Sequence, residues 1–270
     1  LGSGIGFRMP FTEQVLAAHE EVDFLEVTPD HFLDKTAEKA RLLDRLLNKF
    51  TVVPHGLNLS LGSAEGLNRE YLGQLEEMVG RMDPPWWSEH ISFNQAGEVE
   101  IGHLSPVPFN REGLNVICEN VRIACDAIER PLILENITYT MQLPWNDIDE
   151  GEFLAELLER SGCGLLLDVT NLYTNSVNHN YDPGPFLDQL PADRVVQLHY
   201  VGGEYSQGRL IDNHCHDTPE PVWDLMREVY RRFPVKAAIL ERDDNFPEFS
   251  SLLEEVDRCR KTAREMGRWT

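Results

Sequence analysis

Eight short runs of apolar residues recur along the 270 residues of this chain, and stretches with a helical pattern separate them. The runs are rich in Val, Ile and Leu without strict alternation, which is typical of parallel strands covered on both faces. We predict strands at residues 4–7, 23–27, 51–55, 86–91, 131–135, 164–168, 195–199 and 236–241. We predict helices at residues 12–20, 34–49, 67–81, 110–129, 151–161, 183–190, 219–232 and 247–266. Strands that alternate with helices eight times favour a (β/α)8 barrel over a doubly wound sheet.

The length of the chain favours one catalytic domain over residues 1–270. A barrel of this kind typically takes about 250 residues. The sequence holds no internal repeat and no Ser-, Gly- or Pro-rich stretch long enough to link two domains. Two predicted strand-to-helix loops, residues 92–109 and 200–218, are long, and we expect such loops to shape access to the site.

A polar side chain, in most cases one able to bind a metal ion, stands at or just past the end of each apolar run. The carboxyl ends of barrel strands lie on one rim, where active sites of this architecture are built. We therefore expect these side chains to come together. In chain order they are Arg8, Glu26, His55, Glu89, His90, Glu135, Asn136, Asp168, His199 and Glu241.

His55 and His90 end neighbouring predicted strands, and Glu135 ends the next one. Adjacent strands lie about 5 Å apart, so two imidazoles at their ends can share one cation. The carboxylate of Glu135 has two oxygens, so it can complete that site and bridge to a second metal ion. The alternative for a single buried histidine is an ordinary hydrogen-bonded structural role.

Further ligands follow later in the chain. Those expected for a second ion are Asp168, His199 and Glu241. Those expected for a third, weaker position are Asn171, Asp212 and His214. Each acid taken alone has the ordinary alternatives of a salt bridge or a helix cap. Together, so many carboxylates at one rim would repel one another, and bound cations resolve that conflict.

The identity of the metal is less determined than its presence. Nitrogen and oxygen ligands without thiolate suit Fe, Mn or Zn. Open-shell ions can activate O2, whereas Zn or Mg act as Lewis acids or generate hydroxide. We add two candidate catalytic residues beside the ligands. Asp243, just past the last strand, is expected to orient a ligand, and His216 is a ligand-supporting donor, a general acid or simply an exposed residue.

The formal net charge of −22 counts against a nucleic-acid substrate, because phosphate binding normally requires a basic surface. Five cysteines without a CxxC pair favour a reducing, cytoplasmic location. No apolar run approaches the roughly 18 to 20 residues that span a bilayer, and no signal-peptide pattern opens the sequence. We therefore expect no membrane partner.

Two resemblances follow from these motifs. The order His, His, Glu, Asp-x-x-polar, His, Asp-x-His, Glu resembles the trinuclear zinc site of endonuclease-IV-type DNA repair barrels, although Asn171 stands where that family has a histidine. A closer resemblance is to the multinuclear non-haem iron-dependent oxidative enzymes, which include the methanobactin-type oxazolone-forming enzymes. The segments of this chain that carry the closer resemblance are HGLNLSLGSAEGLNREYL (55–72), SEHISF (88–93), LLLDVTNLYTNSVNH (165–179) and LIDNHCHDTPEPVWDL (210–225).

The closer resemblance implies a xylose-isomerase-like TIM barrel that holds two or three irons cycling between Fe(II) and Fe(III). It also implies O2 as co-substrate, a cysteine of a ribosomally made precursor peptide as the target, and a separate small partner protein that recognises the peptide leader. The chain departs from the family pattern at Thr28-Pro29-Asp30 and at the LERDDN that ends strand eight, which bears on substrate identity. Redox-neutral metal hydrolysis or sugar isomerisation on the same barrel is the alternative, and a non-enzymatic metal-storing scaffold is a third.

Overall fold

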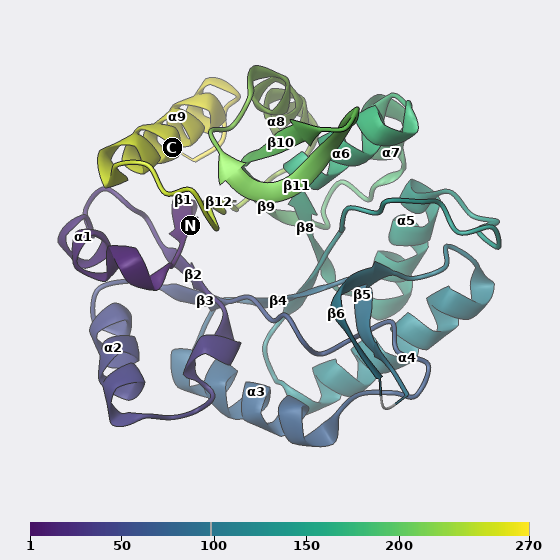
Figure 1. Ribbon diagram of the computed structural model, residues 1–270, viewed down its shortest axis with the longest axis horizontal. Helices are drawn as coiled ribbons and strands as arrows, with labels where there is room; N and C mark the ends of the chain where they lie inside the picture. Colours follow the sequence, from purple (N-terminus) through teal and green to yellow (C-terminus); the bar gives the residue numbers. More distant parts are fainter. Residues whose placement is uncertain (98, 270) are drawn as a thin grey trace.

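Eight parallel strands form one barrel sheet, and helices surround it on the outside (Figure 1). The structure is a computed structural model that describes residues 1–97 and 99–269. The barrel strands are β1 (Gly2–Gly6), β2 (Leu25–Val27), β3 (Val52–Pro54), β4 (Trp87–His90), β7 (Leu132–Glu135), β8 (Gly164–Asp168), β9 (Val195–Tyr200) and β12 (Ala237–Leu240). The predicted (β/α)8 barrel is confirmed, with each predicted strand in place.

The order of the sheet is β3-β2-β1-β12-β9-β8-β7-β4, so its two end strands are β3 and β4. These two strands meet at one isolated parallel bridge, between His55 and Ser88. There the amide of Gly56 donates to the carbonyl of Ser88 at 2.7 Å, and Nδ1 of His55 lies 2.8 Å from the Ser88 hydroxyl. The barrel is therefore closed through a narrow seam.

The predicted helices are also found, most of them shorter by a few residues. They are α1 (Thr12–Ala17), α2 (Ala37–Leu47), α3 (Arg69–Met82), α4 (Arg111–Ala127), α5 (Glu150–Ser161), α7 (Pro183–Gln189), α8 (Glu220–Arg232) and α9 (Phe249–Glu265), with short 3-10 turns η1 (Met9–Phe11) and η2 (Pro29–Phe32). Side chains cap several of the starts: Asn68 accepts from two amides of α3, and Asn110 accepts from Gly113 of α4. None of the described helices is both long and apolar enough to cross a membrane.

Three segments expected to be loops have regular structure. Residues 169–179 form a further helix, α6 (Val169–His179). The predicted loop 92–109 contains the hairpin β5 (Ser92–Ala96) and β6 (Val99–Pro106), with residue 98 outside the described part, and the predicted loop 200–218 contains the hairpin β10 (Gly202–Ser206) and β11 (Arg209–His216). Both hairpins stand largely outside the core, so their strands lack the apolar pattern of buried ones.

The apolar core lies in two places and leaves the carboxyl ends of the strands free for polar groups. A small cluster fills the interior of the barrel and comes from the early and middle positions of its strands: Phe24, Val53, Trp86, Ile133, Leu166, Ala237 and Ile239. A much larger cluster packs between the barrel and its helices. Because the apolar filling ends below the rim, side chains at the strand ends face one another across a polar cavity.

Candidate metal centre

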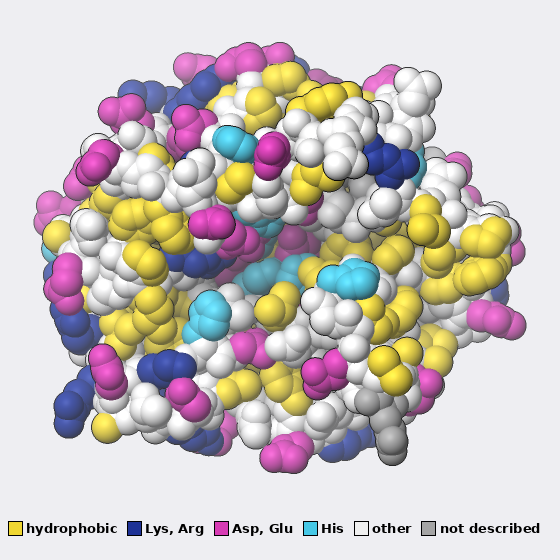
Figure 2. Space-filling model, viewed as in Figure 1, with side chains coloured by type: hydrophobic (Ala, Val, Ile, Leu, Met, Phe, Trp, Pro, Cys, Tyr) yellow, Lys and Arg dark blue, Asp and Glu magenta, His cyan; other side chains and the backbone are white. Residues whose placement is uncertain are grey.

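A cavity of about 450 Å³ opens at the carboxyl ends of the barrel strands. Figure 2 shows this hollow, in which histidine and acidic side chains gather. Of the residues predicted from the sequence, its walls include His55, His90, Glu135, Asn171, Asp212, His214, Glu241 and Asp243. Two more predicted ligands, Asp168 and His199, are fully buried beside them, each 0% exposed.

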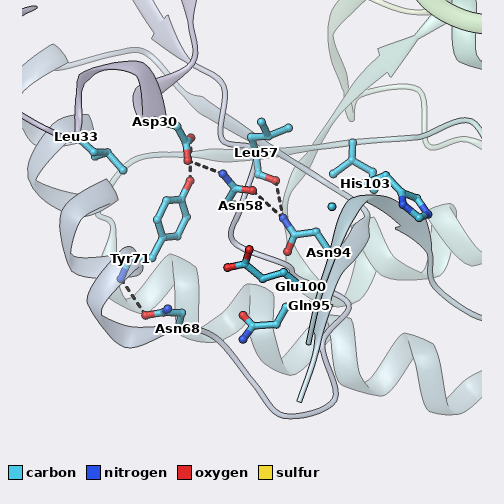
Figure 3. Close-up of a pocket in the computed structure, with 12 residues that line it drawn as sticks. Asp30, Leu33, Leu57, Asn58, Asn68, Tyr71, Asn94, Gln95, Glu100 and His103 are labelled. Carbon is cyan, nitrogen blue, oxygen red and sulfur yellow. Dashed lines mark hydrogen bonds between the residues drawn. The ribbon is translucent and has the colours of Figure 1, made fainter. Parts of the chain in front are cut away.

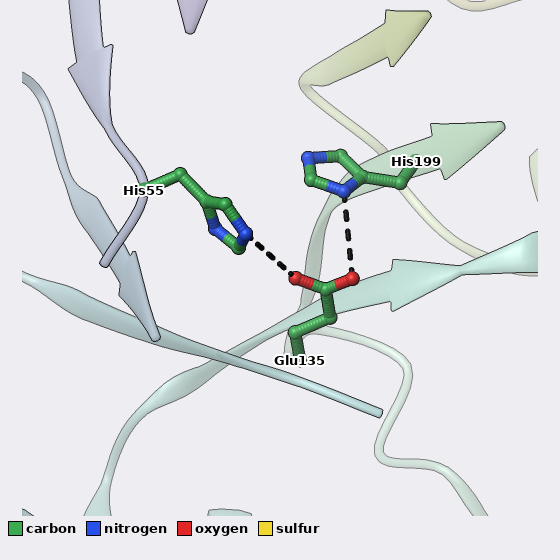
Figure 4. Close-up of side chains that lie close together, drawn as sticks. All are labelled: His55, Glu135 and His199. Carbon is green, nitrogen blue, oxygen red and sulfur yellow. Dashed lines mark ion pairs between the residues drawn. The ribbon is translucent and has the colours of Figure 1, made fainter. Parts of the chain in front are cut away.

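Glu135 lies at the middle of the first group, where its carboxylate faces three imidazole rings. One oxygen, Oε2, lies 3.3 Å from Nε2 of His55 and 3.4 Å from Nε2 of His90. The other, Oε1, lies 3.5 Å from Nδ1 of His199. Figure 4 shows the two oxygens of Glu135 directed at the rings of His55 and His199. This is the arrangement that a carboxylate shared between two cations requires.

Hydrogen bonds fix which nitrogen His55 and His90 present to Glu135. The hydroxyl of Ser88 holds Nδ1 of His55 at 2.8 Å, and the carbonyl of Gly56 lies 3.1 Å from Nδ1 of His90. Each ring therefore turns its Nε2 toward the cavity. Metal-binding histidines are commonly oriented in this way, by a partner on the nitrogen away from the metal.

A second group surrounds His199, on the inner side of β9. Its Nδ1 lies 3.0 Å from Oε2 of Glu241, which follows β12. Glu135, Asp168, His199 and Glu241 each offer one ligand atom, and those four atoms lie within 4.8 Å of one another. These are the residues that the sequence assigned to a second ion.

A column of hydrogen bonds inside the barrel determines the orientation of His199. The indole of Trp86, which can only donate, donates to Oε1 of Gln197 at 2.8 Å. The amide nitrogen of Gln197 then donates to Glu26 at 2.6 Å, and Glu26 lies 2.8 Å from Nε2 of His199. Glu26 therefore accepts the Nε2 proton and leaves Nδ1 to face Glu135 and Glu241. From the sequence, Glu26 is expected at a strand end without a site role, and Trp86 and Gln197 are not among the predicted site residues. The i, i+2 spacing of Gln197 and His199 nevertheless places both side chains inside the barrel.

The third predicted group comes from α6 and β11. Oδ1 of Asp168 accepts from the amide of Asn171 at 2.7 Å and so caps α6. The side-chain nitrogen of Asn171 donates to the carbonyl of Asn136 at 3.0 Å, which leaves its oxygen toward the cavity. On β11, Asp212 lies 2.8 Å from Nε2 of His214. Asn171, Asp212 and His214 all line the same cavity.

Buried atoms without hydrogen-bond partners show that these residues fit cations. Among the described residues, five such atoms belong to the predicted ligands: Oε2 of Glu135, Oδ2 of Asp168, Oδ1 of Asn171, Nδ1 of His199 and Oδ1 of Asp212. A buried polar atom without a partner typically costs about 1 to 3 kcal/mol. All five are atoms able to donate an electron pair to a metal, so bound cations would satisfy them together.

The pKa values of the groups around the cavity also indicate a site that favours bound positive charge. Burial, with the charges of Glu135 and Asp212, raises the pKa of Asp168 to about 8. Burial opposes protonation of His90, yet the charges of Glu135 and Glu89 outweigh it and raise the pKa of that ring to about 9. Burial would also raise the pKa of Glu241, but His199 and His214 bring it well below its usual value. The carboxylates thus demand positive charge, which protons or metal ions can supply.

The two predicted catalytic residues are placed differently. Asp243 lines the cavity, accepts from Nε of Arg8 at 2.8 Å, and lies 2.9 Å from Nδ1 of His214. It therefore links a guanidinium to a predicted ligand, in keeping with an orienting role. His216 is exposed near Glu204 and Cys215 on the β10–β11 hairpin and is not among the residues that line the cavity. Its catalytic role remains a prediction.

Fold and site together define a β/α-barrel enzyme with a rim suited to metal ions. The family described as RiPP precursor modification enzyme MbnB/TglH/ChrH matches residues 2–264, and the chain belongs to this family. A UPF0276 protein of Caulobacter vibrioides is 38% identical over 262 residues, which cover 96% of this chain and 93% of the relative. A UPF0276 protein of Chromobacterium violaceum is 35% identical over 256 residues, covering 95% and 92%.

Solved structures confirm the xylose-isomerase-like fold. A xylose isomerase domain protein from Alicyclobacillus acidocaldarius superposes with a TM-score of 0.64 at 13% identity, over 97% of this chain and 99% of that one. A D-psicose 3-epimerase, solved in the presence of D-fructose, gives a TM-score of 0.56 at 10% identity, over 98% and 96%. At such identities the likeness concerns the fold alone.

Proposed function

We propose that this chain is a multinuclear iron-dependent oxidase that uses O2 to modify a cysteine of a ribosomally synthesised precursor peptide, with residues 1–270 acting as one catalytic domain. Membership of a family of RiPP precursor modification enzymes supports the peptide substrate. The iron and the oxidation rest on the ligand set and on the resemblance of the sequence motifs. Iron bound at this rim would supply the electrons that reduce O2.

Three positions are proposed, with Glu135 shared between the first two. The first would be held by His55, His90 and Glu135. The second would be held by Glu135, Asp168, His199 and Glu241. The third would be held by Asn171, Asp212 and His214. Imidazole and carboxylate ligands without thiolate are a set that would suit iron, and a substrate thiolate is a further ligand of a type that iron accepts.

The observation that carries the proposal is the orientation of His199. Since Glu26 takes its Nε2 proton, the lone pair of a neutral His199 would face the carboxylates of Glu135 and Glu241 from Nδ1. Burial opposes a charge on this ring, yet the charges of Glu26, Glu241 and Glu135 raise the pKa of His199 well above its usual value, so the buried carboxylates call for positive charge at Nδ1. In the metal-free protein a proton on Nδ1 supplies that charge, and in the proposed enzyme a metal ion would take the place of this proton.

Asp243 is proposed to orient His214, one of the ligands of the third position. Its side chain lines the cavity, and the Arg8 guanidinium holds it from the side. Burial opposes the charge of Arg8, but the charges of Asp243 and Glu241 raise the pKa of the guanidinium, so Arg8 stays charged. A carboxylate held in this way would fix the orientation of the His214 ring through its contact with Nδ1.

The proposal includes a separate small protein that recognises the leader of the precursor peptide. This part rests on the resemblance of the motifs alone. Co-purification of this chain with proteins encoded beside its gene, with and without the candidate precursor peptide, tests it. A peptide modified at full rate in the absence of any second protein would contradict it.

Metal analysis of anaerobically purified protein, paired with Mössbauer and EPR spectroscopy, tests the main proposal. We expect two to three irons per chain, at least partly coupled and of mixed valence, with O2 uptake that depends on a cysteine-containing peptide. The variant Glu254→Gln removes an exposed carboxylate on α9 and should keep the same iron content. Stoichiometric zinc without iron after iron-replete expression would instead favour redox-neutral hydrolysis or sugar isomerisation.

A further inference from the structure

A second cavity, of about 440 Å³, adjoins the metal cavity. The two share part of their walls, formed by Leu57, His103 and Leu104. Both volumes fall within the range of about 300 to 1,000 Å³ that is usual for ligand pockets. A peptide with one residue in the metal cavity would therefore place neighbouring residues in or beside the second cavity, which we call the side pocket.

A chain of hydrogen bonds fixes the polar groups of the side pocket (Figure 3). The hydroxyl of Tyr71 donates to one oxygen of Asp30 at 3.0 Å, and the amide of Asn58 donates to the other at 2.7 Å. Asn94, on the β5–β6 hairpin, donates in turn to the side-chain oxygen of Asn58 at 2.9 Å. Asp30 is thus held on both oxygens by neutral groups from two other segments.

The charge of the side pocket is one-sided. Its lining includes two carboxylates, Asp30 and Glu100, and contains neither Lys nor Arg. Tyr71 and Asn58 donate hydrogen bonds to Asp30 but leave its negative charge uncompensated. Glu100 stands on β6 and projects into the pocket from the hairpin (Figure 3). In the described part of the chain neither Asp30 nor Glu100 forms an ion pair with a Lys or Arg, whereas acids such as Glu77, Glu13 and Asp44 do.

We infer that the side pocket binds a positively charged side chain, Lys or Arg, of the substrate peptide, close in sequence to the residue held in the metal cavity. This inference rests on the proposed peptide substrate. An extended peptide advances about 3.3 to 3.6 Å per residue, so adjoining cavities correspond to residues within a few positions of each other.

The test uses synthetic hexapeptides with one cysteine and a single lysine placed at each other position in turn, with glutamine and glutamate counterparts. Dissociation constants are measured by titration calorimetry at low and high salt. At the best position we expect lysine to bind at least ten-fold more tightly than glutamine, with glutamate weaker still and the preference reduced by salt. Equal binding of lysine and glutamine at every position would overturn the inference.

Two variants locate the preference. Glu100→Gln alters an exposed side chain on β6, so we expect the variant to fold normally. The ratio of the affinities for the lysine and glutamine peptides should fall at least three-fold. Asp30→Asn keeps the shape of the side chain and should lower the ratio further, with its thermal midpoint as the check on folding. Glu254→Gln removes the same charge from α9 and should leave the ratio unchanged. A ratio that survives in both pocket variants would contradict the assignment.

Binding and turnover separate this inference from the proposed function. A lysine preference that depends on Asp30 and Glu100, in a protein without iron-dependent O2 uptake, would sustain the side pocket and reject the oxidase. O2 uptake with peptides that show no charge preference would sustain the oxidase and reject the side pocket.

Discussion

Glu26 on β2 contacts His199 on β9 across the interior of the barrel, with Nε2 of the imidazole 2.8 Å from Oε1 and 3.0 Å from Oε2 of the carboxylate. The two strands are separated in the sheet by β1 and β12, so this contact does not come from neighbouring positions. This contact sets which nitrogen of His199 faces the metal cavity. Glu26 is not among the proposed metal ligands, yet we expect it to influence metal affinity through His199.

Replacement of that carboxylate should weaken the second metal position. Glu26→Gln keeps a hydrogen-bonding group but loses the negative charge that increases the basicity of the ring, and we expect metal affinity to fall by about 10- to 100-fold. Competition with a chelator of known affinity measures it. Glu254→Gln on α9 is the matched control for loss of one carboxylate, and identical affinities in the two variants would refute the role of Glu26.

Glu135→Gln tests the bridge between the first two positions. Because the carboxylate faces His55 and His90 on one side and His199 on the other, its loss should remove more than one ion per chain and abolish turnover, with the fold intact. Metal content and circular dichroism measure both effects. Glu150→Gln alters a carboxylate outside the metal cavity, one that accepts from the hydroxyl of Tyr139, and should keep the full metal count. Full stoichiometry in Glu135→Gln would contradict the bridge.

Asp212→Ala should remove the third ion selectively. Asp212 lines the cavity beside His214, whereas the next residue, Asn213, directs its side chain to Glu204 at 3.1 Å. Asn213→Ala is therefore a control on the same strand, and its metal count should equal that of the unmodified protein. If Asp212→Ala also keeps every ion, β11 has no part in metal binding.

Glu150, outside the metal cavity, should contribute a pH-dependent stability. Burial is the main cause that raises the pKa of this carboxyl from 4.5 to about 7, and a hydrogen bond from Tyr139 only partly opposes it. The folded state therefore favours the protonated form. The contribution of Glu150 to the free energy of unfolding is therefore fully present below pH 4.5 and is lost as the pH rises through 7. Relative to Glu150→Gln, the unmodified protein should lose about 1 to 2 kcal/mol between pH 5 and 8, an estimate reduced for partial exposure.

Urea unfolding of both proteins at pH 5 and pH 8 measures this difference. Since the metal cavity is the same in both, its own pH dependence cancels in the comparison. A difference between the two proteins that does not vary with pH would show that Glu150 titrates normally.

The parts of the fold that were predictable are those in which burial shapes the sequence. Barrel strands such as β7 and β8 are covered on both faces, so their apolar runs are continuous and their ends are sharply marked by Glu135 and Asp168. The segment after Asp168 is rich in Asn, Thr and Ser, which have low helix propensity. It forms α6 because Asp168 caps it and because it packs beside β9, β11 and α8, contacts that no local pattern reveals.

The candidate site also contains residues that the sequence predicts and residues that it does not. Residues at strand ends could be named because the barrel topology alone brings them to one rim. The residues that orient them could not, since the Trp86–Gln197–Glu26 column depends on which side chains face one another across the barrel. Likewise, the distance from Asp212 to the strand ends is set by the β10–β11 hairpin, whose sequence predicts a loop.

The narrow seam between β3 and β4 lies directly under the predicted first metal position. His55 and His90 approach across it with ring centroids 4.6 Å apart, and Gly56 makes its backbone hydrogen bond to Ser88 there. An ion bound by both imidazoles would link the ends of β3 and β4 and so stabilise the closed barrel. We therefore expect the Gly56 amide to exchange with deuterium faster once a chelator has stripped the protein, before any helix loosens. Metal binding and closure of the barrel would then be coupled. In a cell short of metal, the protein would therefore be open between β3 and β4 as well as inactive.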